Sequence, residues 1–145
     1  VEAELVADTI GSLLGRTWID FDGNQHEVTA EHVMVVAPYN DHVDLVRATL
    51  DADPTTAAAR VATVDKFQGQ EAPVVIFTMA TSSGEYMPRT ADFLYSRNRL
   101  NVAISRARAL AYVICTEDLL DTRAKTVDEM KLIGTLCAFV EAAQR

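Results

Sequence analysis

Residues 61–108 decide how this chain folds. The stretch opens with VATVDKFQGQE (residues 61–71), continues through the apolar run PVVIFTMA (residues 73–80) and closes with RLNVAISRAR (residues 99–108). The apolar run predicts a buried strand, and Gly69 predicts a polar turn before it. The spacing of apolar residues in the closing piece predicts a helix over residues 98–108, with arginines at both margins of its apolar stripe.

Four polar residues in this stretch are candidates for one polyanion site. They are Gln68, Glu71, Arg106 and Arg108. Loops that follow the strands of a parallel sheet gather at one edge, and ligands bind at that edge. We therefore expect these four side chains to share the carboxyl edge of the sheet.

The rest of the chain alternates helices and strands around this stretch. Helices are expected over residues 1–14, 40–50 and from 126 onward, and strands over 33–37, 60–64, 73–78 and 111–115. Continuous apolar strands separated by amphipathic helices are typical of parallel sheets covered on both faces. The sequence thus predicts one α/β domain over residues 1–145, with three layers and a mainly parallel sheet flanked by helices.

A segment of different character interrupts this pattern at residues 17–28. Trp18, Ile19 and Phe21 precede Asp22-Gly23, a pair that favours a tight hairpin turn. We expect a surface insertion here, with Trp18 engaged in packing.

Composition narrows the class of protein. The chain is 49% hydrophobic, which supports a real core, and no apolar run reaches the length of a membrane span. We expect a cytoplasmic protein without membrane contact and without a metal site of its own. Cys115 and Cys137 lie among apolar residues, which predicts buried structural thiols.

The net charge of −8 excludes a generic nucleic-acid-binding domain, which would be basic overall. Basic residues are nevertheless concentrated between residues 86 and 110, where five arginines face a single acidic residue. They are Arg89, Arg97, Arg99, Arg106 and Arg108, against Asp92. A local cluster of this kind can serve a phosphate ligand on an acidic body.

Three pieces of the sequence also resemble a known family. The first, VMVVAPYN (residues 33–40), is similar to motif IV of superfamily 1 helicases, TVDKFQGQE (residues 63–71) to motif V, and RLNVAISRAR to motif VI. The pieces occur in the order of the Upf/Dna-type branch, the AAA_12-like helicases. The chain is identified by this resemblance as the second, C-terminal RecA-like domain of such a helicase.

The resemblance implies an ATP site to which this domain contributes one half. Arg106 would be the arginine finger that meets the γ-phosphate, a role worth about 10³–10⁵ in rate. Other positions would bind the nucleotide: Gln68 and Gly69 near the phosphates, Glu71 at the ribose hydroxyl or on an arginine, Tyr39 near the adenine, and Arg108 beside Arg106 or paired with a carboxylate. ATP with Mg²⁺ is the implied cofactor, and the metal ligands are expected on the companion domain.

The same resemblance implies a track for single-stranded DNA or RNA across the same edge. Thr63 and Asp65 match positions that touch the phosphate–sugar backbone, and Thr81, Ser82 and Ser83 offer hydroxyl groups to phosphate oxygens. DNA is favoured over RNA, and the branch implies movement from 5′ to 3′. The partners would be the nucleic acid and the first RecA-like domain of the full-length chain.

Two departures from the family limit what this chain can do alone. His42 stands where the family often has Gln, and neither Gly-x-x-x-x-Gly-Lys-Ser/Thr nor an Asp-Glu pair ending an apolar strand is present in the sequence. We therefore expect the isolated fragment to be inactive as an ATPase. The alternative is a non-catalytic RecA-like regulatory or protein-binding module, because a fold does not imply a function.

Overall fold

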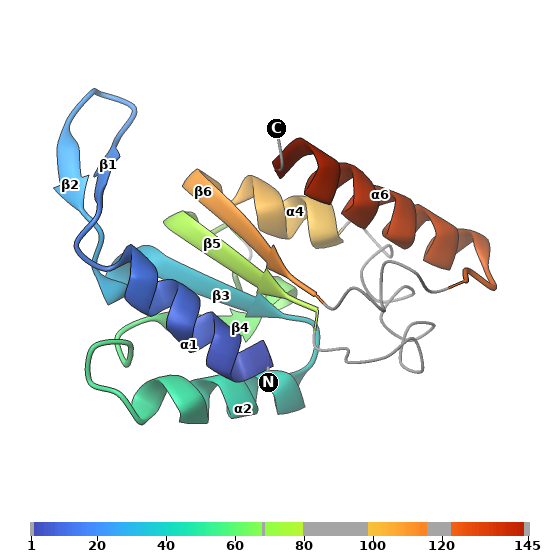
Figure 1. The fold of residues 1–145 in the computed structure, drawn as a ribbon, viewed down its shortest axis with the longest axis horizontal. Helices are drawn as coiled ribbons and strands as arrows, with labels where there is room; N and C mark the ends of the chain where they lie inside the picture. The colour runs from blue at the N-terminus through green and yellow to red at the C-terminus, as the bar shows by residue number, and fades with distance from the viewer. Residues whose placement is uncertain (1, 68, 80–98, 116–122, 144–145) are drawn as a thin grey trace. The chain divides into compact units, whose positions relative to one another are not determined.

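A parallel sheet of four strands is the centre of this structure, a computed structural model that describes residues 2–67, 69–79, 99–115 and 123–143. The strands lie in the order β4-β3-β5-β6, and neighbouring strands run parallel throughout. Their bounds are β3 (Val33–Ala37), β4 (Arg60–Thr63), β5 (Ala72–Thr78) and β6 (Ala107–Ile114). The predicted α/β fold, with a parallel sheet flanked by helices, is confirmed (Figure 1).

The chain divides into two compact units. One comprises Val1–Ala80 and Asn101–Ile114, and it contains the whole sheet. The other comprises Thr81–Leu100 and Cys115–Arg145, of which the helix α6 (Val127–Ala143) is described. Among the described helices, none combines the length and the apolar character needed to cross a bilayer.

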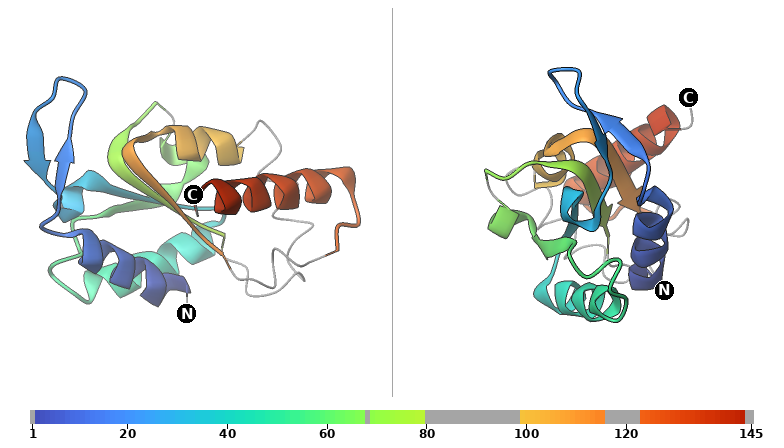
Figure 2. Two further views of the ribbon diagram at one scale, coloured as in Figure 1. Left: turned by 45° about the horizontal axis from the view of Figure 1, so that its top comes forward. Right: turned by 90° about the vertical axis from the view of Figure 1, so that its left-hand side faces the viewer.

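Both faces of the central strands are buried, as their unbroken apolar sequences predict. Val35 and Ile76, paired across β3 and β5, belong to a cluster shared with two helices, α1 (Glu2–Leu13) and α2 (Asn40–Asp51). Met34 and Phe77 alternate with them along the strands and are also fully buried. Helices α1 and α2 lie side by side against the sheet (Figure 2).

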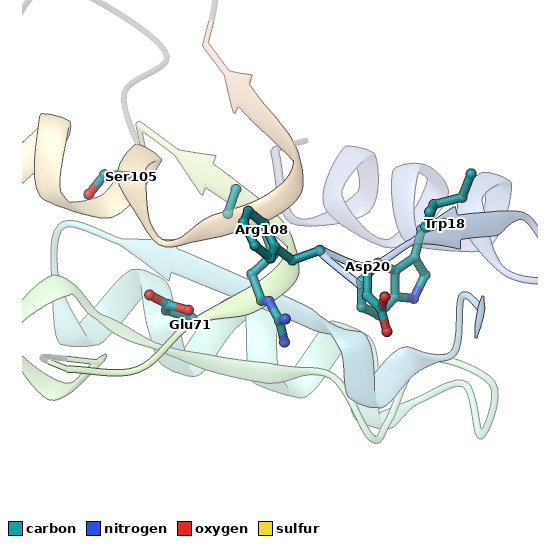
Figure 3. Close-up of a pocket in the computed structure, with 8 residues that line it drawn as sticks. Trp18, Asp20, Glu71, Ser105 and Arg108 are labelled. Carbon is teal, nitrogen blue, oxygen red and sulfur yellow. The ribbon is translucent and has the colours of Figure 1, made fainter. Parts of the chain in front are cut away.

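Residues 17–27 form a two-stranded antiparallel hairpin that projects beyond the amino ends of the sheet strands (Figures 1 and 2). It consists of β1 (Thr17–Ile19) and β2 (Gln25–Glu27). Gly23 takes a φ of 86° in the turn, and the Asp20 carboxylate accepts hydrogen bonds from the backbone N–H groups of Asp22 and Asn24. Trp18 lies on β1, and its ring approaches Arg108 of β6 (Figure 3).

The boundary between the last described helix of the first unit and its final strand differs from the prediction. Helix α4 ends at Ser105, and β6 begins at Ala107, four residues earlier than expected. The reason is pairing: β6 pairs with β5 along the whole length of that seven-residue strand, from Ala72 to Thr78. Arg106 therefore occupies the junction, and Arg108 lies on a strand instead of a helix.

The second unit corrects two further expectations. In α6 the buried side chains are Glu129, Leu132 and Leu136, whereas Cys137 is exposed. Cys115 is half-buried. Thr126 caps the start of α6, because its hydroxyl accepts a hydrogen bond from the backbone N–H of Glu129 at 3.1 Å.

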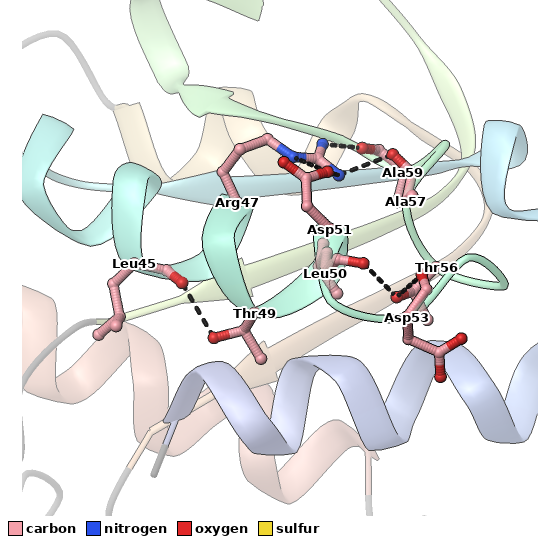
Figure 4. A network of polar contacts seen from close by, with 9 residues as sticks. All are labelled: Leu45, Arg47, Thr49, Leu50, Asp51, Asp53, Thr56, Ala57 and Ala59. Carbon is pink, nitrogen blue, oxygen red and sulfur yellow. Dashed lines mark hydrogen bonds and ion pairs between the residues drawn. The ribbon is translucent and has the colours of Figure 1, made fainter.

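Arg47 holds the connection between α2 and β4 (Figure 4). Its guanidinium donates to the carbonyl oxygens of Ala57, at 2.7 Å, and Ala59, and it also pairs with Asp51 one turn along the helix. The guanidinium thus provides hydrogen bonds to two carbonyl oxygens of the loop that leads into β4. The planar guanidinium can reach both at once, which a lysine cannot.

We expect Arg47→Ala to lower the free energy of unfolding by about 1–3 kcal/mol, because charge-assisted hydrogen bonds to two carbonyl groups are lost. Asp51→Asn is the matched control and should cost less than about 1 kcal/mol, since that ion pair is solvent-exposed. Urea unfolding of the two variants measures the difference. Equal losses would contradict the assignment of stability to the carbonyl contacts.

A second polar cluster ties α1, α2 and β5 together at the carboxyl end of the sheet. His42 Nε2 lies 3.0 Å from the Thr78 hydroxyl, which donates in turn to the Glu2 carboxylate. Because the hydroxyl donates to Glu2, it accepts from His42, so the neutral ring carries its proton on Nε2. Burial lowers the pKa of His42 below its ordinary value of 6.5, although Glu2, 3.8 Å away, opposes this shift.

The lowered pKa of His42 makes a directional prediction for stability. The unfolded chain binds this proton at a higher pH than the folded protein, so stability is complete above pH 6.5 and is lost as the pH falls through the folded pKa. Denaturant midpoints between about pH 8 and 5 should therefore fall more steeply for the wild type than for His42→Gln. Parallel pH profiles would show that His42 is not responsible.

Candidate nucleotide and nucleic-acid sites

The turn before β5 and the junction before β6 lie side by side. The backbone N–H of Ala72 donates to the carbonyl of Arg106 at 3.1 Å, and Ala72 pairs with Ala107 in the sheet. Glu71 is exposed next to this pair, and the Arg106 side chain is half-exposed. Three of the four residues expected to form one polyanion site, Glu71, Arg106 and Arg108, are thus brought together, whereas Gln68 lies outside the described residues.

Gly69 shapes the turn. Its φ of 78° is in the left-handed region, and a Cβ placed on it would meet open space. The backbone N–H of the next residue, Gln70, donates to the carbonyl of Phe67 at 2.9 Å. The side-chain oxygen of Gln70 accepts from the Arg60 guanidinium at 3.1 Å. Arg60 opens β4, so the turn is attached to the amino end of the sheet and presents an uncovered backbone at Gly69.

This location corrects the expectation of a single shared edge. Glu71 and Arg106 immediately precede their strands, so they lie at the amino edge of the sheet. Tyr39 follows β3, and Thr63 ends β4, so both lie at the carboxyl edge. Four residue steps along β3 separate the two edges by roughly 13 Å. The expectation assumed that functional loops follow strands. Instead, the motif V segment runs from the end of β4 back to the start of β5, and Arg106 of motif VI immediately precedes β6.

The predicted nucleic-acid residues are only partly described. Thr63 is half-buried at the end of β4, paired with Ala37, and Asp65 is exposed in the short 3₁₀ helix Val64–Phe67. Thr81, Ser82 and Ser83 lie outside the described residues, as do Arg89 and Arg97 of the basic cluster. The side chain of Arg99 is likewise not described.

Arg108 lies at an irregularity in the pairing of β5 with β6. Ala72 pairs with Ala107 and Val74 with Leu110, so the span across Pro73 holds one extra residue on β6. Proline has no N–H to donate, and within a central strand it is tolerated at such bulges. Arg108 lies in this span, exposed, with its guanidinium carbon 5.9 Å from the centre of the Trp18 ring. The expected pairing of Arg108 with a carboxylate is not seen among the described residues.

A pocket of about 320 Å³ opens between the hairpin and this edge (Figure 3). Both hairpin and motif residues line it, namely Trp18, Ile19, Asp20, Phe21, Glu71, Ser105, Ala107 and Arg108. Sequence reasoning missed the hairpin side, because Trp18 belongs to none of the recognised motifs. Its position next to an Asp-Gly turn predicted a hairpin but not the direction in which that hairpin faces.

The charges around the pocket are mixed. Hydrogen bonds from His26 and from the backbone of Asn24 hold the pKa of the Asp20 carboxyl below 3.8, so Asp20 stays ionised near neutral pH. Asp20 and Glu71 therefore contribute negative charge, and Arg108 contributes positive charge. Within the described ranges, no group of three or more His, Cys, Asp or Glu side chains could hold a metal ion.

Comparison with known proteins bears on this arrangement. The AAA_12 family, described as an AAA domain, matches residues 1–118. The chain is 37% identical to the DNA-binding protein SMUBP-2 of Rattus norvegicus over 99 residues, which are 67% of this chain and 9% of that protein. It is 31% identical to the probable RNA helicase armi of Drosophila melanogaster over 97 residues, 64% of this chain and 8% of that protein.

A third relative aligns with more of this chain. The DNA polymerase alpha-associated DNA helicase A of Schizosaccharomyces pombe is 33% identical over 113 residues, 78% of this chain and 15% of that protein. In each case the chain matches only a small part of the relative. The chain therefore belongs to the AAA_12 family, and its resemblance to the second RecA-like domain of Upf-type superfamily 1 helicases is confirmed.

Proposed function

We propose that this domain supplies one half of the ATP site of a nucleic-acid helicase and part of its single-strand track. The observation that carries the proposal is the hydrogen bond between Ala72 and Arg106, which keeps the motif VI arginine beside the motif V turn. The amino edge of the sheet would face the triphosphate held by the companion domain. The nucleic acid would run along the opposite, carboxyl edge.

The residues at the amino edge suit the chemistry of phosphoryl transfer. Negative charge spreads over the γ-phosphate oxygens in the transition state, and a guanidinium stabilises it through two parallel hydrogen bonds. No ion pair or hydrogen bond engages the guanidinium of Arg106 within the described part of the chain, so it is available to a ligand. Gly69 would let the backbone approach the phosphates, and the preceding residue, Gln68, would also lie near them. Glu71 would accept a hydrogen bond from a ribose hydroxyl.

The residues at the carboxyl edge suit contacts with a nucleic-acid backbone. Thr63 and Asp65 can hydrogen-bond sugars and phosphates without reading sequence. Thr81, Ser82 and Ser83 lie outside the described residues, and their hydroxyl groups would add to these contacts. Tyr39 lies at this edge, away from Glu71 and Arg106, so we leave it out of the nucleotide site. Two ligands at opposite ends of one rigid sheet would couple closure around ATP to movement along a strand.

Arg106→Ala in the intact protein tests the finger. We expect the nucleic-acid-stimulated ATPase rate to fall by about 10³-fold or more, with unchanged thermal stability, because the charge that meets the γ-phosphate is lost. Arg106→Lys should not restore it, since an ammonium group lacks the planar fork.

The matched control is Arg16→Ala, which removes an exposed arginine outside the site. Near-normal turnover by a folded Arg106→Ala protein would favour the alternative of a non-catalytic module. That alternative predicts no dependence of ATP hydrolysis on this side chain.

We also expect the isolated 145-residue chain to hydrolyse no ATP and to bind it weakly. Its sequence has no phosphate-binding loop with a Lys-Ser/Thr pair, and no apolar strand in it ends in an Asp-Glu pair that could serve Mg²⁺ and water. Phosphate release measured with and without single-stranded DNA checks this. Turnover above the background of an Arg106→Ala chain would contradict the half-site proposal.

A further inference from the structure

The hairpin β1–β2 is built around a short series of contacts that ends on Arg108. The Asp20 carboxylate accepts from His26 Nε2 at 2.6 Å, and the His26 ring stacks on Trp18 with 4.6 Å between ring centres. Trp18 in turn lies 5.9 Å from the Arg108 guanidinium. Each contact restricts the next, from the hairpin turn to a cation on β6.

Trp18 carries a cost that simple packing would avoid. Its indole N–H is buried and has no hydrogen-bond partner among the described residues. A phenylalanine or leucine would pack here without an unpaired donor. Leucine, however, offers no π face to a cation, and phenylalanine offers a weaker one than tryptophan.

A cation–π contact uses the charge of the guanidinium and none of its N–H groups. The N–H groups of Arg108 therefore remain available for oxygen ligands. Arg108 lines the pocket together with Glu71 and Ser105. The pocket therefore combines donors for a phosphate oxygen with an acceptor for a hydroxyl group, which together fit the ribose–phosphate part of a nucleotide.

We propose that Trp18 is a positioning residue of the nucleotide site, which holds Arg108 in place for a ribose–phosphate group in the hairpin pocket. This inference rests on the proposed function, because it takes the amino edge to be the edge that receives ATP. It adds the hairpin, which lies outside all three helicase motifs, to the structures that determine nucleotide affinity. The pocket is large enough for part of a nucleotide and is open toward solvent.

The test compares Trp18→Leu, Trp18→Phe, Arg108→Ala and the double variant Trp18→Leu/Arg108→Ala in the intact protein. We expect Trp18→Leu to raise the KM for ATP about two- to fivefold, the range of an exposed cation–π contact, and to leave kcat near the wild-type value. Trp18→Phe should restore only part of the affinity, because its π face is weaker. On the Arg108→Ala background, Trp18→Leu should have no further effect.

Equilibrium binding of a non-hydrolysable ATP analogue provides a readout besides turnover and should follow the same order. Gln25→Ala, on the opposite strand of the hairpin and outside the pocket, is the matched control and should bind like the wild type. If Trp18→Leu does not fold, His26→Ala replaces it, because it removes the ring that stacks on Trp18 and His26 does not line the pocket, and the same rise in KM is expected.

Wild-type affinity in Trp18→Leu, or additive effects of the two single changes, would overturn the inference. So would wild-type affinity in Arg108→Ala. An unchanged kcat in Arg106→Ala would instead overturn the proposed function itself, so the two failures are distinguishable.

Discussion

The hydrogen bond from Ala72 to Arg106 determines where motif V and motif VI meet in this domain. It is the first rung of the pairing between β5 and β6, and it joins two motifs that are far apart in sequence. Without it, the glycine turn and the arginine junction would have no common location. Because both segments precede their strands, the pairing also assigns them to the amino edge of the sheet.

A parallel sheet offers two edges, and this domain uses them differently. The amino edge carries Glu71, Gly69 and three arginines, namely Arg60, Arg106 and Arg108, while the carboxyl edge carries Tyr39, Thr63 and the buried cluster of Glu2, His42 and Thr78. The two central strands, β3 and β5, are apolar and fully buried, so they connect the edges through a close-packed core. Such a core transmits a rigid-body movement with little deformation, which is what the proposed position between a nucleotide and a nucleic-acid strand requires.

The hairpin β1–β2 is separate from the four-stranded sheet, and its own local contacts hold it together. Its turn is specified locally by Gly23 and by the Asp20 carboxylate, and its ring contacts lead from that turn to Arg108. Pro73 contributes from the other side, because the bulge across it exposes Arg108 on β6. A cation in this position is held by an aromatic face instead of a carboxylate, so its charge is not neutralised by a protein partner in the described structure.

The sequence by itself determined the α/β class, the central strands, the turn at Gly69 and the motif residues. Apolar runs, caps and turn residues act locally, so their signals survive without a structure: Gly15 ends α1, and Asp22-Gly23 marks the hairpin. Only the tertiary structure decided which edge each motif occupies, where β6 begins, and that Trp18 faces Arg108. Those features depend on strand order and on pairing between distant segments, and no local pattern in the sequence encodes either one.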